Sequence, residues 1–305
     1  MGAVAGRLEF RHSMQRAIST YLFVNQKLTA ALLADIERAG FSQVELFCSR
    51  AHFDYRSAGV IRELEEWLKE HTLAVHALHA PTGSDFAPVR EGGVPISISD
   101  PERVRRLDAV DEIKHALDIV EKIPFQFLIQ HIGGGREGMD PRRFDAAFNS
   151  LEHLAMFAKQ RGITVALENT PGELASPLNL RHFIEDTRLR DLRLCFDIGH
   201  AHMEEGIERS YETMRDFVVT AHVHDNRGEK DEHLFPYEGT IDWAATLQML
   251  RTAPAAPGGL PLVLELKEPA PAGVHARPLE QAAAVFDKFE QELAACEERG
   301  RSARP

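Results

Sequence analysis

A set of histidine, aspartate and glutamate side chains stands at spacings typical of a metal-dependent enzyme. Each of them lies at, or just after, the end of a short apolar run that is predicted to form a strand. Carboxylate and imidazole groups together suit Zn²⁺, Mn²⁺, Fe²⁺ or Co²⁺, and the pattern does not choose among these ions. The candidate metal ligands are His79, His131, Glu168, Asp197, His200, His222, Asp231, His233 and Glu265.

The strand end at His222 is the richest in such residues. Because side chains alternate along a strand, His222 and His224 are expected on one face, and Asp231 and His233 follow in the next loop. One strand end could thus serve two ions. A lone histidine is more often an ordinary core or surface residue, and this interpretation stays open for His224, which is otherwise a candidate substrate contact.

Three further strand ends carry carboxylates. Asp197 closes an apolar run, and the glycine turn before His200 can bring both side chains to one side, unless Asp197 simply caps the next helix and His200 is solvated. Glu168 and Glu265 lie in otherwise apolar strand ends, where a carboxylate is costly unless it is paired or bound to metal. Structural salt bridges are the alternative for these two glutamates.

The elements that must position these residues alternate between apolar runs and segments of helical period, which predicts repeated strand–helix units and a parallel sheet. We expect an α/β fold, a (β/α)8 TIM barrel in a single domain over 16–296, whose strand ends all open onto one face. An N-terminal extension is expected at 1–15 and a disordered tail at 297–305. Strands are predicted near 17–23, 43–47, 73–79, 125–131, 163–168, 192–197, 218–224 and 261–266, and helices near 28–39, 58–71, 101–122, 141–161, 242–252 and 277–296.

Composition narrows the functional classes. The net charge of −12 over 305 residues disfavours nucleic acid as a partner without excluding it, because bound cations would add positive charge where a substrate docks. No apolar stretch is long enough to span a membrane, and the first residues lack a signal-peptide core, so a cytoplasmic protein with no membrane partner is expected. The glycines of 133–138 fit a dinucleotide motif, but no acid follows at the required spacing.

These residues resemble the xylose-isomerase-like barrel superfamily, which includes endonuclease IV and many sugar isomerases and epimerases. The resemblance covers roughly Arg16 to Phe289, and its most specific parts are Glu168-Asn169-Thr170, Asp197-x-x-His200, His222-x-His224-Asp225-Asn226, Asp231-x-His233 and Glu265. For the isomerases it implies one divalent ion, bound by Glu168, Asp197, His222 and Glu265. For the endonuclease IV branch it implies three zinc ions, with His79, His131, His200, Asp231 and His233 as additional ligands. One to three ions are therefore expected.

The resemblance favours a metal-dependent isomerase or epimerase of a small sugar, sugar phosphate or cyclitol. Polarisation of the carbonyl would make the adjacent C–H more acidic and stabilise an enediolate. Glu168 and Glu265 would be the proton-transfer pair, and His200 and Arg227 would hold substrate oxygens. Arg50 and His52, in the loop after the second strand, are further candidate substrate contacts. A homo-oligomer is compatible with this interpretation.

The alternative is a multinuclear zinc phosphoesterase of the endonuclease IV (AP endonuclease) type. Closely spaced ions would then generate a hydroxide, and Glu168 would bridge the ions instead of moving a carbon-bound proton. The loop after His79 lacks the Tyr-Leu wedge expected for prying open a damaged duplex, which weakens this alternative. A lyase or deglycosidase of modified sugars, and a barrel that binds sugar without turnover, are further alternatives.

Overall fold

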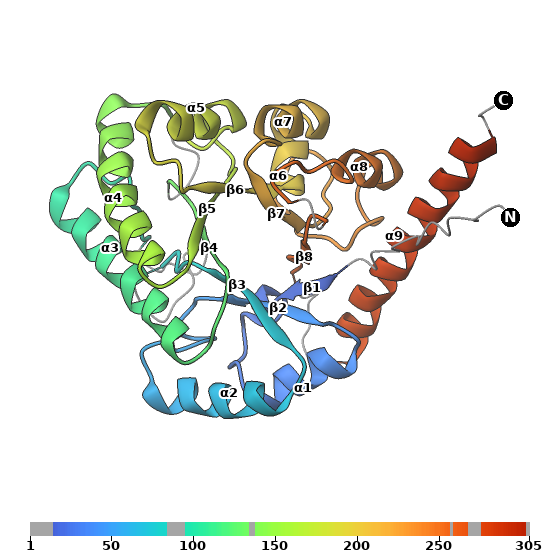
Figure 1. The fold of residues 1–305 in the computed structure, drawn as a ribbon, viewed down its shortest axis with the longest axis horizontal. Helices are drawn as coiled ribbons and strands as arrows, with labels where there is room; N and C mark the ends of the chain where they lie inside the picture. Colours follow the sequence, from blue (N-terminus) through green and yellow to red (C-terminus); the bar gives the residue numbers. More distant parts are fainter. Residues whose placement is uncertain (1–14, 84–94, 134–137, 257–258, 268–275, 303–305) are drawn as a thin grey trace, which may run out of the picture.

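Eight parallel strands close into a barrel in sequence order, and β1 pairs with both β2 and β8. The structure is a computed structural model that describes residues 15–83, 95–133, 138–256, 259–267 and 276–302. The strands occupy the centre and the helices surround them (Figure 1). The predicted single (β/α)8 barrel is confirmed. The strands are β1 (Arg16–Ser19), β2 (Gln43–Phe47), β3 (Ala74–His79), β4 (Phe127–Gln130), β5 (Thr164–Glu168), β6 (Arg193–Asp197), β7 (Val218–Val223) and β8 (Leu262–Leu264).

The helices begin where the sequence supplies caps. The side chains of Thr29, Ser57, Asp140, Ser176, Asp197 and Asp242 each accept a hydrogen bond from a backbone N–H of the first helical turn. Proline stands in the first turn of α4 and α5, where its missing N–H costs nothing. The helices are η1 (Thr20–Phe23), α1 (Ala30–Arg38), α2 (Ala58–Glu70), α3 (Arg103–Leu117), η3 (Asp118–Glu121), α4 (Pro141–Lys159), α5 (Pro177–Thr187), α6 (Ile198–Met203), α7 (Ile207–Met214), α8 (Trp243–Leu250) and α9 (Ala276–Ser302).

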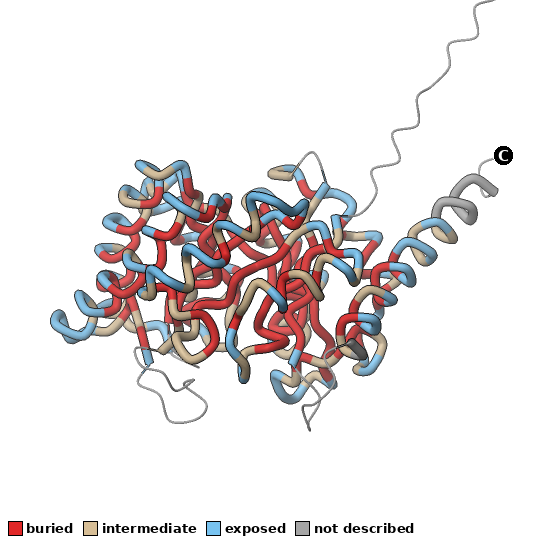
Figure 2. The backbone as a smooth tube through the Cα atoms, turned by 90° about the horizontal axis from the view of Figure 1, so that it is seen from below, coloured by how far each residue is buried: buried red, intermediate tan, exposed pale blue. Residues whose placement is uncertain are grey.

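A small apolar layer inside the barrel explains where the candidate ligands lie. Buried side chains from neighbouring strands form this layer, among them Ala77, Ile129, Ala166 and Cys195. Because side chains alternate in direction along a strand, the residue two positions further along each chain faces the barrel axis as well. Those residues are His79, His131, Glu168 and Asp197. An apolar floor thus lies below a layer of ligands at the C-terminal ends of the strands, within the buried interior of Figure 2.

Two segments differ from the predictions. The expected strand at 17–23 ends at Ser19, whose hydroxyl accepts from the N–H of Tyr21 and starts the 3-10 helix η1. The prediction was wrong there because a short apolar run does not distinguish a strand from a buried turn. At the other end, a disordered tail was expected at 297–305, but α9 continues through 297–302. The Ala, Glu and Arg residues of this segment are good helix formers. Residues 1–14 and 303–305 lie outside the described residues.

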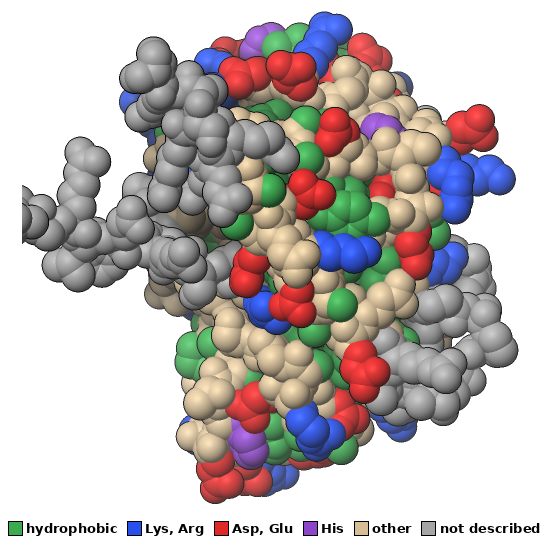
Figure 3. All heavy atoms as spheres, turned by 90° about the vertical axis from the view of Figure 1, so that its right-hand side faces the viewer, with side chains coloured by type: hydrophobic (Ala, Val, Ile, Leu, Met, Phe, Trp, Pro, Cys, Tyr) green, Lys and Arg blue, Asp and Glu red, His purple; other side chains and the backbone are tan. Residues whose placement is uncertain are grey.

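The outer surface mixes both signs of charge. On the face drawn in Figure 3, Asp and Glu side chains are interspersed with Lys and Arg around patches of apolar atoms. Within the described ranges, no helix is both long enough and apolar enough to cross a membrane. Helix α9 packs against α8 and α1 and reaches beyond the barrel wall (Figure 1).

Candidate metal centre

Four candidate ligands at neighbouring strand ends form a compact, buried set, here called the central group. Each offers one ligand atom, and these atoms lie within 4.8 Å of one another. Nδ1 of His222 lies 3.5 Å from Oε2 of Glu168 and 3.5 Å from Oε2 of Glu265. It lies 3.8 Å from Oδ2 of Asp197. One imidazole nitrogen facing three carboxylates is a donor set for a divalent cation. The central group is Glu168, Asp197, His222 and Glu265.

The surroundings of Nδ1 of His222 indicate whether a divalent ion would fit the central group. This atom is buried and has no hydrogen-bond partner among the described residues. The other ring nitrogen, Nε2, lies 3.1 Å from Oε2 of Glu45, to which it donates a hydrogen bond. An unpartnered nitrogen surrounded by carboxylates is costly in a buried site unless a cation lies between them. The central group therefore fits a divalent ion.

Glu45 was not among the residues predicted for the site. It lies on β2, and its side chain is as fully buried as that of His222. Burial raises the pKa of Glu45, but the charge and hydrogen bond of His222 outweigh burial and lower the pKa below its usual value. A carboxylate that accepts from a ligating imidazole orients the ring and raises its basicity. The sequence does show a glutamate inside the apolar run 43–47, but no residue nearby in the sequence indicates that His222 is its partner.

A second set, the flanking group, shares Glu168 with the central group. It consists of His79, His131 and Glu168, whose ligand atoms again lie within 4.8 Å of one another. Nε2 of His79 lies 3.4 Å from Oε2 of Glu168, and Nε2 of His131 lies 3.1 Å from the same oxygen. Nδ1 of His79 lies 3.0 Å from the carbonyl oxygen of Ala80, which accepts its proton. Glu168 is thus placed to bridge two adjacent cation positions.

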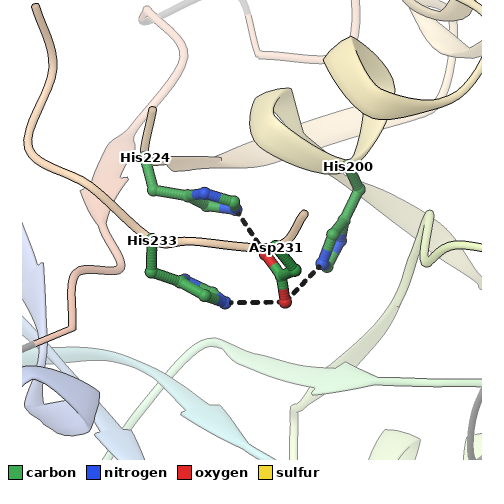
Figure 4. Close-up of side chains that lie close together, drawn as sticks. All are labelled: His200, His224, Asp231 and His233. Atoms are coloured by element: carbon green, nitrogen blue, oxygen red, sulfur yellow. Dashed lines mark hydrogen bonds and ion pairs between the residues drawn. The ribbon is translucent and has the colours of Figure 1, made fainter. Parts of the chain in front are cut away.

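A third set, the outer group, comprises His200, His224, Asp231 and His233 (Figure 4). His200 comes from α6, His224 follows β7, and Asp231 and His233 come from the loop after β7. His224 was predicted to be an ordinary histidine or a substrate contact. Its ring is fully buried, as that of a core histidine would be, and it stacks on His233 with ring centroids 4.0 Å apart. Its Nε2 lies 3.1 Å from Oδ1 of Asp197. Both ring nitrogens of His200 also have protein partners, which favours a ligand role over contact with substrate.

The charges in these groups stabilise one another. Burial alone lowers the pKa of His79, but the hydrogen bond and the negative charge of Glu168 outweigh it and raise the pKa to about 9. Burial raises the pKa of Glu168, whereas the charges of His131 and His222 hold it well below its usual value. In the metal-free protein, protons on imidazoles therefore balance the carboxylates. Uptake of a divalent ion must release some of those protons.

The loop that carries Asp231 and His233 is fixed at its base by a buried carboxylate. Asp225 accepts hydrogen bonds from the backbone N–H of Asn226 and from Nε1 of Trp243, each at 2.9 Å. A Cβ atom at Gly239 would lie 2.2 Å from Oδ1 of Asp225, so a glycine is required there. The loop is therefore held in place by its own buried contacts.

The remaining predicted substrate contacts have separate surroundings. His52 is buried, and its Nδ1 lies 2.5 Å from the carbonyl oxygen of Gln26. Burial lowers the pKa of His52 to about 4. These contacts assign His52 to the packing of its loop. Arg50 is half-buried beside Asp54, and Arg227 is exposed, with Nη1 2.6 Å from Oε1 of Glu232. Both arginines remain candidates for substrate contact.

The chain is similar in sequence to two proteins of Methanocaldococcus jannaschii. The uncharacterized protein MJ1311 is 28% identical over 248 residues, which cover 78% of this chain and 80% of that protein. The uncharacterized protein MJ1614 is 25% identical over 234 residues, which cover 75% of this chain and 85% of that protein. The likeness thus extends over most of each protein.

Several solved structures share the fold. A D-tagatose 3-epimerase-like protein has a TM-score of 0.74 at 22% identity, with 94% of this chain and 99% of that chain covered. An L-ribulose 3-epimerase has a TM-score of 0.75 at 18% identity, with coverage of 96% and 100%. The IOLI protein with a bound zinc atom has a TM-score of 0.69 at 14% identity, with coverage of 91% and 96%. The profile of the xylose isomerase-like TIM barrel family matches residues 33–292, and the chain belongs to this family.

Proposed function

We propose that the protein is a divalent-metal-dependent isomerase or epimerase of a small sugar, sugar phosphate or cyclitol. One observation carries the proposal: a buried, unpartnered imidazole nitrogen faces three carboxylates at the open end of the barrel. This donor set suits a divalent ion. The C-terminal end of a (β/α)8 barrel is also where the active sites of such enzymes lie.

The similar structures support a carbohydrate as the substrate. They include the D-tagatose 3-epimerase-like protein, the L-ribulose 3-epimerase and a 3-keto-D-glucoside 4-epimerase. A D-psicose 3-epimerase was crystallised in the presence of D-fructose. The zinc atom of the IOLI protein supports a divalent metal as the cofactor.

The carboxylates of the central group supply the proton transfer. A divalent ion held by this group would act as a Lewis acid that polarises a sugar carbonyl and acidifies the neighbouring C–H. Glu168 takes the carbon-bound proton and Glu265 returns a proton, so that two carboxylates serve two faces of one carbon. Their side chains are almost fully buried, and this limits the access of water that would compete for the proton. Arg227, which is exposed in the loop after β7, would contact a substrate oxygen.

The flanking group and three members of the outer group, His200, Asp231 and His233, also match the ligands expected for the multinuclear phosphoesterase. Ions in all three groups would suit phosphoester cleavage, in which Glu168 bridges two of them. The carbohydrate-related structures favour isomerisation or epimerisation over this alternative.

Exchange of carbon-bound hydrogen tests the proposal. The metal-loaded protein is incubated in D₂O with a panel of ketoses, aldoses and their phosphates, and deuterium in recovered sugar is measured by NMR. We expect incorporation next to the carbonyl, loss of incorporation on chelation, and recovery on re-addition of metal. Glu168→Gln should lower the rate at least 100-fold, because it removes the carboxylate that takes the proton.

Glu152→Gln, on the exposed face of α4, is the matched control and should be unaffected. An oligonucleotide with an abasic site is assayed in parallel. Cleavage of that oligonucleotide without any deuterium exchange would replace the proposal by the phosphoesterase alternative. Normal exchange by Glu168→Gln would contradict the proton-transfer role given to Glu168.

A further inference from the structure

We propose that His224 is a positioning residue for Asp197 and binds neither the substrate nor a metal ion. Its imidazole holds the Asp197 carboxylate in the orientation that the central group needs, and Gly199 provides the space for the ring. The inference rests on the divalent ion that the proposed function places in the central group, but not on the sugar chemistry. It removes His224 from the candidate ligands of the outer group.

The carboxylate of Asp197 needs a partner that fixes its rotation. Asp197 ends β6 and caps α6, where its Oδ1 accepts a hydrogen bond from the backbone N–H of His200 at 2.6 Å. That one bond leaves the carboxylate able to turn, because the torsion about the Cβ–Cγ bond of aspartate has only broad preferences. The other oxygen, Oδ2, lies 3.8 Å from Nδ1 of His222. A turn of the carboxylate would therefore move the oxygen that faces the central group.

His224 supplies this partner. Its Nε2 lies 3.1 Å from Oδ1 and 3.1 Å from Oδ2 of Asp197, so a single N–H donates a forked hydrogen bond to both oxygens. The fork sets the plane of the carboxylate, and together with the bond from the backbone of His200 it fixes both oxygens. Asp197 and His224 are fully buried, so the fork is shielded from solvent. Hydrogen bonds to a charged acceptor are stronger than those between neutral groups.

Neither ring nitrogen of His224 is placed to bind a metal ion. Nε2 carries the proton of the fork, because an ionised carboxylate can only accept. Nδ1 is buried without a hydrogen-bond partner among the described residues, and it lies beside Gly199, where a Cβ atom would be 2.4 Å away. Oδ1 of Asp231, the nearest acidic atom of the outer group, is 3.9 Å from Nε2. Full burial of the ring also keeps it from the substrate.

Gly199 is matched to this ring. A Cβ atom at position 199 would lie 2.0 Å from Cε1 of His224, closer than atoms can approach. Gly199 lies in α6 and its φ is outside the left-handed region, so the backbone there does not require glycine. Glycine is also among the least favourable residues inside a helix. The glycine therefore serves the ring, which His233 covers on one face with centroids 4.0 Å apart (Figure 4).

The end of β7 thus supplies a ligand and also the support of its neighbour. Asp197 and His222 are paired in the register of β6 and β7, and His224 follows two positions along the chain, on the same side as His222. Oδ1 of Asp197 is held by two donors, so Asp197 offers Oδ2 to the central group and not both oxygens. A divalent ion with one oxygen from Asp197 keeps a further position for a substrate oxygen.

Binding of Mn²⁺ alone tests this role. The full-length protein is stripped of metal and titrated with Mn²⁺, and free Mn²⁺ is measured by electron paramagnetic resonance. The binding step that Glu265→Gln removes is assigned to the central group, because Glu265 belongs to no other set of candidate ligands among the described residues. His224→Leu lacks the N–H donor and should weaken this step about 10–100-fold, as loss of a ligand's partner typically does. His224→Gln should retain most of the affinity, because its side-chain N–H can replace that of Nε2.

Two further variants separate positioning from packing. Gly199→Ala keeps the imidazole but displaces it, so it should weaken the same step as His224→Leu does. His202→Leu is the matched control and should bind Mn²⁺ normally, because Nδ1 of His202 lies 2.8 Å from the uncharged side chain of Asn226. A merely structural role would make His224→Gln and His224→Leu equivalent, and that result would overturn the proposal.

Nuclear magnetic resonance of the unaltered protein adds a test that needs no variant. With ¹⁵N-labelled histidine and ¹¹³Cd²⁺ as the metal, a ring nitrogen of His222 should couple to cadmium and neither nitrogen of His224 should. Coupling at His224, or unchanged Mn²⁺ affinity in His224→Leu, would overturn the role of His224 alone. Lack of a central binding step in the unaltered protein would overturn the proposed function and this inference together. Absence of deuterium exchange into sugars, with the Mn²⁺ results as expected, would contradict the proposed function alone.

Discussion

Replacement of Glu45 by glutamine tests whether this buried carboxylate strengthens the binding of a divalent ion by His222 of the central group. Oε2 of Glu45 accepts a hydrogen bond from Nε2 of His222 at 3.1 Å, and both side chains are fully buried. Glutamine keeps the size and an acceptor oxygen but removes the negative charge, so Nδ1 of His222 becomes a weaker donor to metal. The fold should survive, because shape and hydrogen bonding are conserved.

The expected size of the effect follows from that contact. Loss of an outer partner of a ligating histidine typically weakens metal binding by about 10–100-fold, or about 1.4–2.7 kcal/mol. We expect Glu45→Gln to weaken the binding of a divalent ion by the central group within this range. Binding of any ion by the outer group should be unaffected, because Glu45 has no contact with that group in the described residues. Competition with a chelator of known affinity, monitored at each binding step, measures the change.

The control is Glu66→Gln, on the exposed face of α2. It makes the same chemical change away from the barrel interior and should bind metal normally. If Glu45→Gln folds and binds the central ion within twofold of the unaltered protein, the carboxylate does not tune His222, and the reasoning is refuted. Equal weakening of every ion would point to a general loss of stability.

Two further predictions concern buried packing. Gly199→Ala should lower the free energy of unfolding by about 1–3 kcal/mol, because a Cβ atom there would lie 2.0 Å from the ring of His224. Gly59→Ala, whose Cβ would lie 3.8 Å from its nearest neighbour, is the control and should be nearly neutral when both variants are compared by thermal unfolding. His52 has a folded pKa of about 4 against 6.5 when unfolded, so the unfolded chain binds more protons between these values and stability falls as the pH drops through that window. The free energy of unfolding should fall by about 3 kcal/mol by pH 4. Urea unfolding of His52→Gln should show a weaker dependence of stability on pH in this window, and His153→Gln should behave as the unaltered protein does. Equal pH dependence in both variants would contradict the burial of His52.

The candidate ligands could be predicted because each follows an apolar strand in the sequence. In a closed parallel barrel, the residue after such a strand must lie at one end, and alternation then decides which side chains face the axis. Glu168 and Asp197 were identified in this way, and the structure brings both into the central group. A local pattern together with one rule of topology was sufficient.

Other residues depend on contacts that no local pattern contains. Glu45 contacts His222, a residue 177 positions away in the sequence. His52 looks like a loop residue suited to substrate, but its ring turns inward to the carbonyl oxygen of Gln26. After Ser19 a 3-10 helix forms in place of the expected strand, and a single hydrogen bond to the side chain of Ser19 caps it. In each case a pair of side-chain or backbone atoms decides the outcome, and the sequence names just one member of the pair.

Closure of the ring by the pairing of β1 with β8 has a consequence for biosynthesis. Strand β8 ends at Leu264, and the next residue, Glu265, completes the central group. A nascent chain therefore lacks both the ring and the full set of ligands until this position leaves the ribosome. The central group can therefore be complete only after β8 has joined the ring, whereas the residues of the flanking group are all present once Glu168 has been made.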